Sequence, residues 1–581
     1  MPPVNFLAEK LLATKVATYL CSMFVRTKKL AGGKAKIQIV ESLRENGKVR
    51  QKILRHVGTV SSSQELECFM QLAEYIKAEM ENVKQATLFR ADTLAAMVQR
   101  SRREALHETG HLPVNLRDIR EKHRLVSGIH EIYGSLYDSV GFGAIMRGCP
   151  VSAGVMKDIV VGRIARAVSK KATAEFLETD FGIEIPLEKI YRMLDTLSRK
   201  GRTTSLQKIS WQYSQRLLGS EISILFYDCT TLYFESFTED ELRRFGYSKD
   251  HKFNQGQVLL ALMVTNEGLP VGYEVFPGDT YEGKTFKIAV DRIKKFYKVK
   301  RAIIVADSGL LSRENIELLE KEELEYTVGA RVRSLSKKWQ NRILDNTTYE
   351  KLKKEDETLR IAQFQYNKTR KLIVTYSDKR ALKDSNDRAR AIESLKQKLE
   401  NSQNPKKLVS NYGYQKYIRM EGDVKVAIDQ EKIDKEALWD GLHGIFSNIS
   451  DLPAQDIITQ YHGLWQVEES FRISKHDLRV RPVFHWNASR IRAHIAICFM
   501  AFSLIRFLQY KLLHETKARF SPEKIRAELI RVQDSILTNI HTGQQYVVPS
   551  KPSADAMKIY QTMSKTRRMV PYKLNAGKPE K

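Results

Sequence analysis

Residues 223–228 read SILFYD and residues 302–307 read AIIVAD, and these two stretches decide the fold. Each is a short apolar run that ends in an aspartate, Asp228 in the first and Asp307 in the second. Such runs are typical of strands buried on both faces of a sheet. Two similar runs lie between them, QVLLALMV at 257–264 and VGYEVF at 271–276. Together with the helical pattern of TFKIAVDRIKKFYK, they predict an α/β core.

The two aspartates are candidate metal ligands. In open sheets, ligands bind beyond the carboxyl ends of the strands. Two carboxylates held together there repel each other unless a cation neutralises them, and Mg²⁺ prefers such oxygen ligands. Each aspartate alone could instead cap the turn or helix after its strand, and SGLLSRENIE follows Asp307 as a candidate helix. Asp279 and Glu282 are additional acidic candidates for which a surface-loop role is favoured.

A third carboxylate lies in the helical sequence YHGLWQVEESFRISK, residues 461–475. Tyr461, Glu468 and Lys475 recur at seven-residue spacing, so in a continuous helix they share one stripe that drifts by about 20° per step. Each step rises about 10 Å, so Glu468 could reach a metal while Tyr461 and Lys475 contact phosphates on either side. On spacing alone, an ordinary amphipathic helix with a charged solvent face is the better explanation.

The composition points to nucleic acid. The chain has 581 residues, with 96 Lys and Arg against 69 Asp and Glu, for a formal net charge of +27. A polyanion is the usual partner of such an excess. The five cysteines form no C-x-x-C pair, so neither a zinc ribbon nor a disulfide framework is indicated, and a cytoplasmic location is expected.

The motifs YDCTTLYFES, ADSGLLSRENI and YHGLWQVEESFRISK resemble the three catalytic motifs of DDE transposases from bacterial insertion sequences. More narrowly, they resemble the insertion-sequence-four superfamily, which is marked by Tyr, Arg, Glu and Lys on the last helix. The stretch from Gly246 to Phe286 is similar to the long-chain branch of that superfamily. The resemblance covers most of the chain from about Met23, which is expected to be the true start.

The resemblance implies that Asp228, Asp307 and Glu468 are the catalytic residues and the ligands of two Mg²⁺ ions, with Mn²⁺ as a substitute. One ion would activate water and the other would stabilise the leaving 3′ oxygen. Glu469 competes with Glu468, but the spacing from Tyr461 and Lys475 selects Glu468.

The same family implies DNA contacts by Tyr461 and Lys475. Where the superfamily often has Arg, this chain has Leu464, and Arg472 is the candidate that replaces it. In relatives, the insertion between the second aspartate and the glutamate helps to hold the cleaved DNA end, sometimes by stacking an aromatic residue on a flipped base. Trp339 and Trp439 are the tryptophans of this insertion, with simple core packing as the alternative for both.

The resemblance also implies how the chain is organised. A ribonuclease-H-like core is expected at 220–328 and 451–520, interrupted at 329–450 by a mainly β insertion that carries a charged helix. The residue pattern itself predicts a basic strand unit at 1–60, with strands in FVRT, KIQIVES and KVRQKIL around an Asn46–Gly47 turn, and a helical, DNA-binding region at 61–219. One face of the strands could meet phosphates, and a solvated edge hairpin is the equal alternative. A basic region with a disordered tail is expected at 521–581.

The predicted function is that of a DNA transposase that cuts the ends of its insertion sequence and joins them to target DNA. Its expected partners are double-stranded DNA and a second copy of the chain on paired ends. The alternatives are a ribonuclease-H-like nuclease without strand transfer and an inactive DNA-binding derivative. No membrane is expected, because the apolar run at 495–505 is shorter than the roughly 20 residues that a span requires. A buried core helix is predicted there instead.

Overall fold

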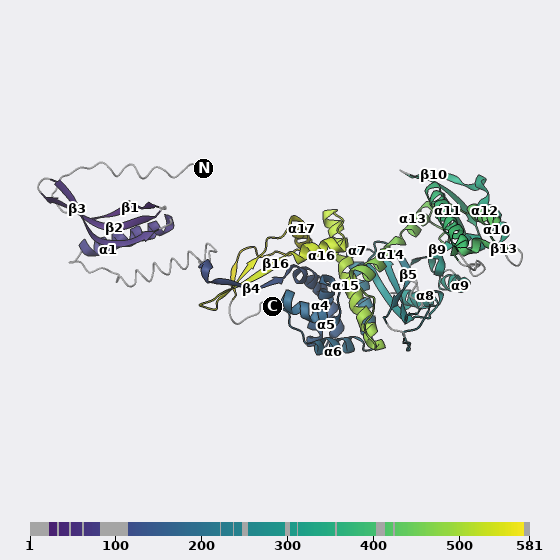
Figure 1. The fold of residues 1–581 in the computed structure, drawn as a ribbon, viewed down its shortest axis with the longest axis horizontal. Helices are drawn as coiled ribbons and strands as arrows, with labels where there is room; N and C mark the ends of the chain where they lie inside the picture. The colour runs from purple at the N-terminus through teal and green to yellow at the C-terminus, as the bar shows by residue number, and fades with distance from the viewer. Residues whose placement is uncertain are drawn as a thin grey trace. The chain divides into compact units, whose positions relative to one another are not determined.

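The computed structural model describes residues 23–31, 34–45, 48–60, 63–81, 114–220, 222–235, 238–246, 254–296, 302–310, 312–354, 357–401, 413–421 and 425–574 (Figure 1). These residues belong to two compact units, Met1–Asn115 and Leu116–Lys581. The residues before Met23, the Asn46–Gly47 turn and the C-terminal tail lie outside the described residues.

The first unit is a three-stranded antiparallel sheet with a helix on one face. Its elements are β1 (Met23–Lys29), β2 (Ala35–Glu45), β3 (Lys48–Val60) and α1 (Ser63–Glu81), and the strands lie in the order β1-β2-β3. The three strands predicted in this segment are therefore confirmed. Apolar side chains fill the space between helix and sheet. Gly58 leaves room for the helix, because a Cβ there would lie 2.3 Å from the Phe69 ring.

The second unit is built on a nine-stranded mixed sheet. The four runs predicted as strands form β5 (Ile224–Tyr233), β6 (Gln257–Thr265), β7 (Pro270–Pro277) and β8 (Ile303–Ala306). Strands β5, β6 and β7 are antiparallel neighbours, whereas β8 runs parallel to β5 on its other side. Strand β9 (Glu325–Ala330) then runs parallel to β8. The predicted α/β class is thus confirmed.

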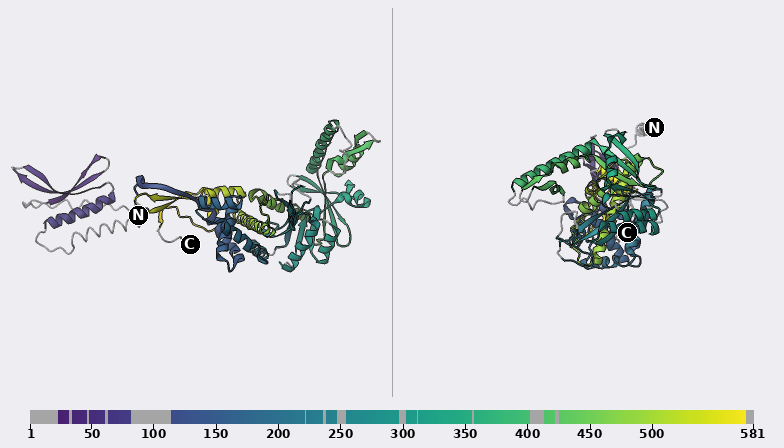
Figure 2. Two further views of the ribbon diagram at one scale, coloured as in Figure 1. Left: turned by 60° about the horizontal axis from the view of Figure 1, so that its bottom comes forward. Right: turned by 90° about the vertical axis from the view of Figure 1, so that its right-hand side faces the viewer.

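The segment expected to be a β insertion continues this sheet. Strand β15 (Leu442–Ser447) pairs antiparallel with β9, and β12 (Lys371–Ser377), β11 (Glu357–Gln365) and β10 (Glu350–Lys354) follow in turn. The charged helix expected from Lys379 is α11 (Asp378–Glu400), which projects from the sheet (Figure 2). The remaining elements of this segment are α10 (Lys337–Leu344), β13 (Ile418–Glu421), β14 (Lys425–Ile428) and α12 (Gln430–Ala437).

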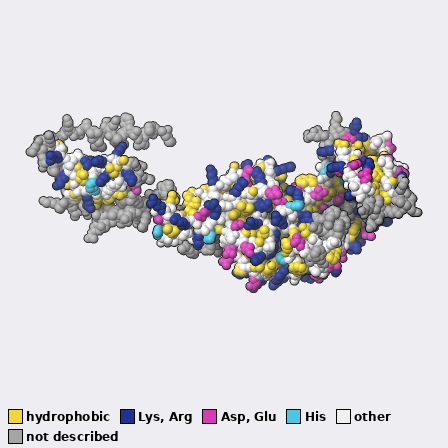
Figure 3. Space-filling view, in the orientation of Figure 1, with side chains coloured by type: hydrophobic (Ala, Val, Ile, Leu, Met, Phe, Trp, Pro, Cys, Tyr) yellow, Lys and Arg dark blue, Asp and Glu magenta, His cyan; other side chains and the backbone are white. Residues whose placement is uncertain are grey.

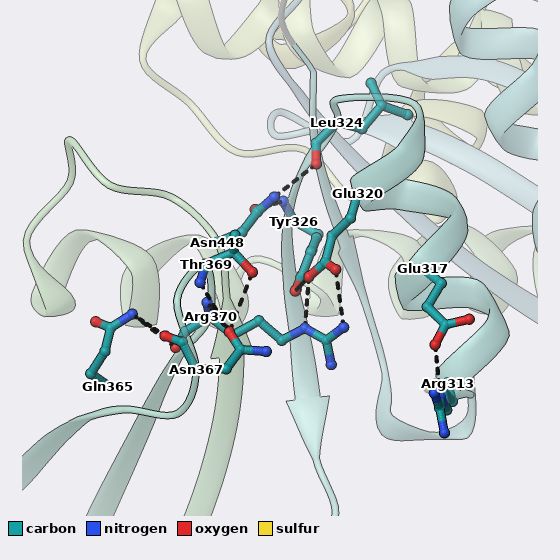
Figure 4. Close-up of polar contacts among 10 residues, drawn as sticks. All are labelled: Arg313, Glu317, Glu320, Leu324, Tyr326, Gln365, Asn367, Thr369, Arg370 and Asn448. Atoms are coloured by element: carbon teal, nitrogen blue, oxygen red, sulfur yellow. Dashed lines mark hydrogen bonds and ion pairs between the residues drawn. The ribbon is translucent and has the colours of Figure 1, made fainter.

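Polar contacts tie the insertion strands to the core strands. The Arg370 guanidinium, in the turn between β11 and β12, donates to Glu320 on α9 (Arg313–Lys321) at 2.6 Å (Figure 4). The Tyr326 hydroxyl donates to the same carboxylate at 2.9 Å. Just after β15, the Asn448 side chain accepts from the Tyr326 backbone N–H and donates to the Leu324 carbonyl. The insertion and the core therefore share one rigid sheet at this point.

Helices cover both faces of the sheet. One core lies between the sheet and α13 (Ala454–His462), α14 (Trp465–Arg472) and α15 (Ala488–Thr516), and the other lies against α8 (Glu282–Asp291) and α9. Helix α15 contains the apolar run predicted to be a core helix. By length and composition it could cross a membrane, but 89% of its most apolar window is buried inside the structure.

Helices from the part of the chain that precedes β5 form a layer that packs against α15. Its helices are α3 (Ser135–Val140), α4 (Pro150–Ala165), α5 (Lys170–Phe181), α6 (Leu187–Leu197) and α7 (Arg202–Leu218). Helix α6 follows Pro186, whose fixed φ suits the position before the first turn.

A four-stranded antiparallel sheet departs from the expected organisation. Strand β4 (Ile119–Val126) lies in the range expected to be helical, and it pairs with β16 (Gln533–Asn539) from the C-terminal range. Strands β17 (Gln545–Pro549) and β18 (Tyr572–Leu574) complete the order β18-β17-β16-β4, and α16 (Pro522–Ile530) and α17 (Ala554–Thr562) flank them. Pairing across more than 400 residues leaves no local periodic signal, which explains why the sequence did not reveal this sheet.

Candidate active site

Asp228 and Asp307 are neighbours on parallel strands. The last parallel pair between β5 and β8 is formed by the residues just before them, so the aspartates occupy the next positions on adjacent strands. Adjacent strands lie about 4.8 Å apart. Phe226 and Val305, two residues earlier on each strand, both face the core beneath α14 and α15. Because side chains alternate along a strand, both aspartates project toward that face.

The prediction that each aspartate ends its strand is correct for Asp307 and wrong for Asp228. Strand β8 ends at Ala306, but β5 continues five residues beyond Asp228 to Tyr233. It does so because β6 stays paired with it, with Leu262 opposite Asp228. Asp228 is therefore half-buried within the sheet, whereas Asp307 is exposed.

Backbone N–H groups orient both carboxylates. The Cys229 N–H donates to Asp228 Oδ1 at 2.7 Å, and the Ser308 N–H donates to Asp307 Oδ1 at 2.6 Å. Such bonds fix the rotamers of the carboxylates while leaving further oxygen lone pairs open.

Tyr461 joins α13 to the end of β8. Its hydroxyl lies 3.5 Å from Asp307 Oδ1, and its ring is buried. Burial raises the pKa of Tyr461, and the negative charges of Asp307 and Glu468 raise it further. Gly329 on β9 makes room for the hydroxyl, because a Cβ there would lie 2.5 Å from it. Tyr461 is thus a buried positioning group, which differs from the exposed phosphate contact that the spacing predicted.

Glu468 lies on α14 above the same face of the sheet. A close approach of helix and sheet is possible at Gly463, where a Cβ would lie 2.4 Å from Phe226 Cζ. Glu468 is exposed, and its carboxylate has no hydrogen bond or ion pair with any residue that the structure describes. Its neighbour Glu469 is engaged with Arg472, at 2.6 and 2.7 Å. The hydrogen bond from Arg472 lowers the pKa of Glu469.

The continuous helix assumed for the Tyr461–Glu468–Lys475 stripe is not observed. Helix α13 ends at His462, and the junction to α14 is closed by tighter bonds, among them Leu464 N–H to Tyr461 O and Val467 N–H to Leu464 O. After α14, Ile473–Asp477 forms a wider π-type turn that contains Lys475. The tighter junction and the wider turn change the number of residues per helical turn, so side chains point in different directions from those in a regular α-helix. Residues seven apart therefore do not lie on one stripe here.

The predicted DNA-contacting residues have different surroundings. Arg472 is half exposed, but Glu469 holds it. Lys475 is half-buried within the π-type turn. Trp439 is only 8% exposed and packs in the core, so its ring has no face for a base. Trp339 packs against Tyr366, with ring centroids 5.0 Å apart, and the Arg342 guanidinium lies over it.

Two exposed tryptophans were not among the site residues predicted from the sequence. Trp465 begins α14, three residues before Glu468, and is 54% exposed. Trp486, just before α15, is 66% exposed, and the Arg243 guanidinium lies over its ring at 5.1 Å. The sequence shows only that these residues are large and apolar; their exposure depends on which face of each segment packs.

A histidine of the insertion also reaches the site. His443 on β15 contacts the Tyr461 ring edge-on, with centroids 5.1 Å apart. Burial lowers its pKa to about 4, with smaller contributions from Arg380 and His462, while the negative charge of Asp307 acts in the opposite direction. Because β15 is brought beside β9 by pairing across more than 100 residues, no local motif could have identified His443.

Glu282 is a fourth carboxylate near Asp307. It opens α8, and one of its oxygens lies 3.6 Å from the position that a Cβ on Gly309 would take. It approaches the loop after β8 from the α8 side of the sheet. The exposed Asp279 stays in the preceding turn, as a surface-loop role requires.

The sequence also contains two short matches to other chemistries, one of which lies within the described residues. GDTYEGKT, 278–285, has the spacing of a phosphate-binding loop, but a Cβ on Gly278 would lie 2.2 Å from Gln257 O and the Thr285 hydroxyl accepts from Tyr227. The glycine therefore packs against the sheet and the threonine is buried, so no phosphate cradle forms. HETGH, 107–111, has the spacing of a zinc-hydrolase motif and lies outside the described residues.

The oxygen donors of the site suit a hard divalent cation. Among the described residues, no group of three or more His, Cys, Asp and Glu side chains is arranged to hold a metal ion ready-made. Asp228 and Asp307 follow paired positions on adjacent strands, and Glu468, which has no partner among the described residues, lies on α14, the helix that packs against β5. Three carboxylates of this kind fit Mg²⁺, which commonly uses one or two protein carboxylates and completes its shell with water and phosphate oxygens.

Comparison with known proteins assigns the chain to a family. The family model described as transposase DDE domain matches residues 219–504, and the model described as IS1634 family transposase, N-terminal domain matches residues 24–87. No curated protein matches the chain.

Two solved structures are weakly similar. A piggyBac transposase synaptic complex with hairpin DNA is 9% identical, with a TM-score of 0.35, over 68% of this chain and 70% of that chain. The Mos1 strand transfer complex is 14% identical, with a TM-score of 0.14, over 45% of this chain and 74% of that chain. Both TM-scores are too low to define the fold, which is given by this chain's own strand order.

Proposed function

This chain belongs to the DDE transposases of bacterial insertion sequences, and from that membership we propose how it acts on DNA. It binds the ends of its own insertion sequence, cuts them by metal-dependent hydrolysis and joins the freed 3′-OH ends to target DNA. Divalent metal ions are general in the DDE family; Mg²⁺, as a pair of ions, is the proposal for this chain, with Mn²⁺ as a substitute.

The strand order supports a ribonuclease-H-like core. Three antiparallel strands, β7-β6-β5, are followed across the sheet by β8 and β9, both parallel to β5. Helices α13 and α14 then return across the face to which the aspartates project. The insertion leaves the core after β9 and re-enters before α13, which supports the proposal of a core at 220–328 and 451–520.

The observation that carries the proposal is the adjacency of Asp228 and Asp307, with α14 and its Glu468 packed against the strand that holds Asp228. Asp228 and Asp307 follow paired positions on β5 and β8, and Glu468 on α14 has no partner among the described residues. Asp228, Asp307 and Glu468 would hold the two metal ions. When bound, the ions would lower the pKa of the attacking water or 3′-OH and stabilise the leaving 3′ oxygen.

The other residues of the site position and bind. Tyr461 donates to Asp307 and so holds that carboxylate against β9. Lys475 and Arg472, on the C-terminal part of the same helical segment, contact DNA phosphates near the cut. Arg472 is proposed to exchange Glu469 for a phosphate, because a guanidinium forms paired bonds with either group.

The partners follow from this reaction. Double-stranded DNA supplies both the element's ends and the target, and a chain with a net charge of +27 suits that partner. Two ends must be cut and joined together, so we propose a homodimer on paired ends. The protein works in the cytoplasm, where the bacterial chromosome lies.

The test is a cleavage and joining assay in Mg²⁺. A labelled duplex that carries the DNA bordering this gene is incubated with a target plasmid and with wild type, Asp228→Asn or the control Asp279→Asn. We expect wild type and Asp279→Asn to cut the end and join it, because Asp279 is an exposed turn residue. Asp228→Asn should bind the end without cutting, since an amide cannot replace the charge of the carboxylate.

Each other outcome has a distinct meaning. Cutting by the Asp228→Asn protein would refute the site assignment. Cutting by wild type without joined products would favour the nuclease alternative. Binding by wild type with neither reaction would favour an inactive DNA-binding derivative.

A further inference from the structure

The first unit is strongly polarised in charge. Strands β1, β2 and β3 carry three, two and four Lys or Arg residues and only two Glu. Helix α1 carries five Glu and a single Lys. By the strand register, Arg26, Lys28 and Lys36 lie on the face opposite α1, whereas Lys29, Lys52 and Arg55 are paired with residues of the α1 side. In Figure 3, dark-blue Lys and Arg side chains dominate the visible face of this unit.

The face of the sheet opposite α1, here called the open face, carries cations without carboxylates. Paired residues of antiparallel strands share a face. Arg26 pairs with Gln38 and Lys28 with Lys36, while Val25 and Ile37, on the alternate positions, pack against the helix. On β3, the residues opposite Gln38 and Ser42 are His56 and Gln51, which extend the open face.

A hydrogen-bond network organises the open face. Arg26 donates through one nitrogen to Gln38 Oε1 at 2.8 Å and through another to Gln51 Oε1 at 2.9 Å. Because a guanidinium can only donate, it fixes the amide orientation of Gln38, whose nitrogen then donates to His56 Nδ1 at 2.9 Å. Gln51 and His56 are exposed, so an amide and an imidazole ring are held in place at the surface.

The shape of the sheet also suits DNA. Among the described residues, β1 pairs with β2 as far as Glu41, and beyond it β2 and β3 continue as a two-stranded ribbon. The major groove of DNA admits a two-stranded β-ribbon, and Gln and Arg side chains recognise the edges of adenine and guanine there. Lys28 and Lys36 flank the network and match the phosphates.

We propose that the open face of the β1–β3 sheet reads the sequence of the element's ends in the major groove of double-stranded DNA. Gln51 and His56 contact base edges, Arg26 is the positioning residue between Gln38 and Gln51, and Lys28 binds phosphate. The inference rests on the proposed function, because it names the surface that recognises the same DNA ends.

The test uses the full chain without divalent metal, so that binding is measured apart from cutting. Affinities are compared for a duplex from the element's end and a scrambled duplex of equal length and composition. The variants are Gln51→Ala on the open face and Gln71→Ala on α1, a matched exposed glutamine of the same unit. Gln51→Ala should lose about 5- to 100-fold of the preference for the end, and Gln71→Ala should retain all of it.

Further variants separate reading from phosphate binding and from misfolding. Lys28→Ala should weaken binding to both duplexes equally, and it should reduce the slope of log affinity against log salt concentration by about 1. Arg26→Lys should reduce the preference for the end, because an ammonium cannot hold both glutamines, while circular dichroism shows the fold retained.

Equal preference by Gln51→Ala and Gln71→Ala, with wild type still cutting the end in Mg²⁺, would overturn this inference and leave the proposed function standing. A wild type that prefers its end but cuts neither duplex would overturn the proposed function instead. If the open-face variants change the oligomeric state but not DNA binding, the face is an interface between copies and the inference is wrong.

Discussion

The two adjacent glutamates of α14 offer a test at single-residue resolution. Glu468 has no partner among the described residues, whereas Glu469 is held by Arg472. Glu468→Gln should reduce end cleavage by roughly 1000-fold or more, because it removes a metal ligand. Glu469→Gln keeps most of the local hydrogen bonding and should reduce cleavage less than about 10-fold. Single-turnover cleavage rates decide between them, and equal losses would mean that the ligand has been misassigned.

A second residue-scale prediction concerns the space beside Tyr461. Gly329→Ala places a Cβ 2.5 Å from the Tyr461 hydroxyl and 2.9 Å from Ser308 N, so it should cost about 1–3 kcal/mol of stability and displace Asp307. Gly309→Ala is the control, because its Cβ meets only Glu282 at 3.6 Å.

Thermal unfolding and cleavage rates measure both effects. Adding Tyr461→Phe to Gly329→Ala removes the clashing oxygen and should restore part of the lost stability. If the double variant were no more stable than Gly329→Ala, the steric explanation would fail.

For single residues, the sequence predicted the surroundings correctly where those surroundings are formed by residues nearby in the chain. Asp228 and Asp307 follow apolar runs that could be read directly, and both lie where parallel strands meet. The surroundings of Tyr461 and His443 could not be read, because each depends on a strand that arrives from a distant part of the chain. The burial of Trp439 likewise depends on tertiary packing rather than on any local pattern.

At the scale of elements, strand β15 should make stability depend on pH through His443. Burial lowers its folded-state pKa to about 4, below the unfolded value of about 6.5. Above about pH 6.5 the histidine is neutral in both states and has no effect. As the pH falls from about 6.5 to about 4, the unfolded chain binds a proton that the folded chain excludes, and stability is lost.

His443→Phe keeps the ring packing against Tyr461 and should remove this contribution. The loss of stability between about pH 7.5 and about pH 5, measured by urea unfolding, should be smaller in the variant by up to about 2 kcal/mol. His485 and His494 are buried with lowered pKa values in both proteins, so the difference isolates His443. Identical pH dependence would contradict the assignment.

The four-stranded sheet yields another prediction. Arg567 is 3% exposed and donates to Glu131 and Asp534, which links the segment before β18 to β16 and the first helical turn after β4. Arg567→Met removes both ion pairs, while Tyr560 still donates to Glu131, and should cost about 3 kcal/mol. Its neighbour Arg568, which stacks on Tyr572 at the surface, is the control, and Arg568→Met should cost less than about 1 kcal/mol. Equal shifts in thermal midpoint would show that the buried network does not stabilise the sheet.

Elements with strong local periodicity were predicted well, including β5, β8, α11 and the core helix α15. Strands β4 and β16 were not predicted, because β4 is a charged, largely exposed strand whose partner lies more than 400 residues away. The α13–α14 junction was taken for continuous helix, since a tightened turn and a π-type turn preserve helical composition while changing the geometry.

At the scale of the whole molecule, the second unit unites the core and the insertion in one sheet. The site lies where that sheet changes from antiparallel to parallel pairing, so residues from β5, β8, α13, α14 and β15 meet there. The first unit adds a basic three-stranded sheet of its own. The charge predicted a nucleic-acid partner, and the resemblance of three motifs to a known family predicted a DNA transposase, because neither depends on tertiary contacts.

The most direct test of the central claim is to count the metal ions bound to the chain on its DNA end. Mn²⁺ binding is measured by electron paramagnetic resonance for wild type, Asp228→Asn, Asp307→Asn and Glu468→Gln, with Glu469→Gln as the control. The three carboxylates are assigned to two ions, so wild type and Glu469→Gln should bind two Mn²⁺ per site and each of the other variants should bind fewer. If all three variants bound as much Mn²⁺ as wild type, these carboxylates would not form the metal site.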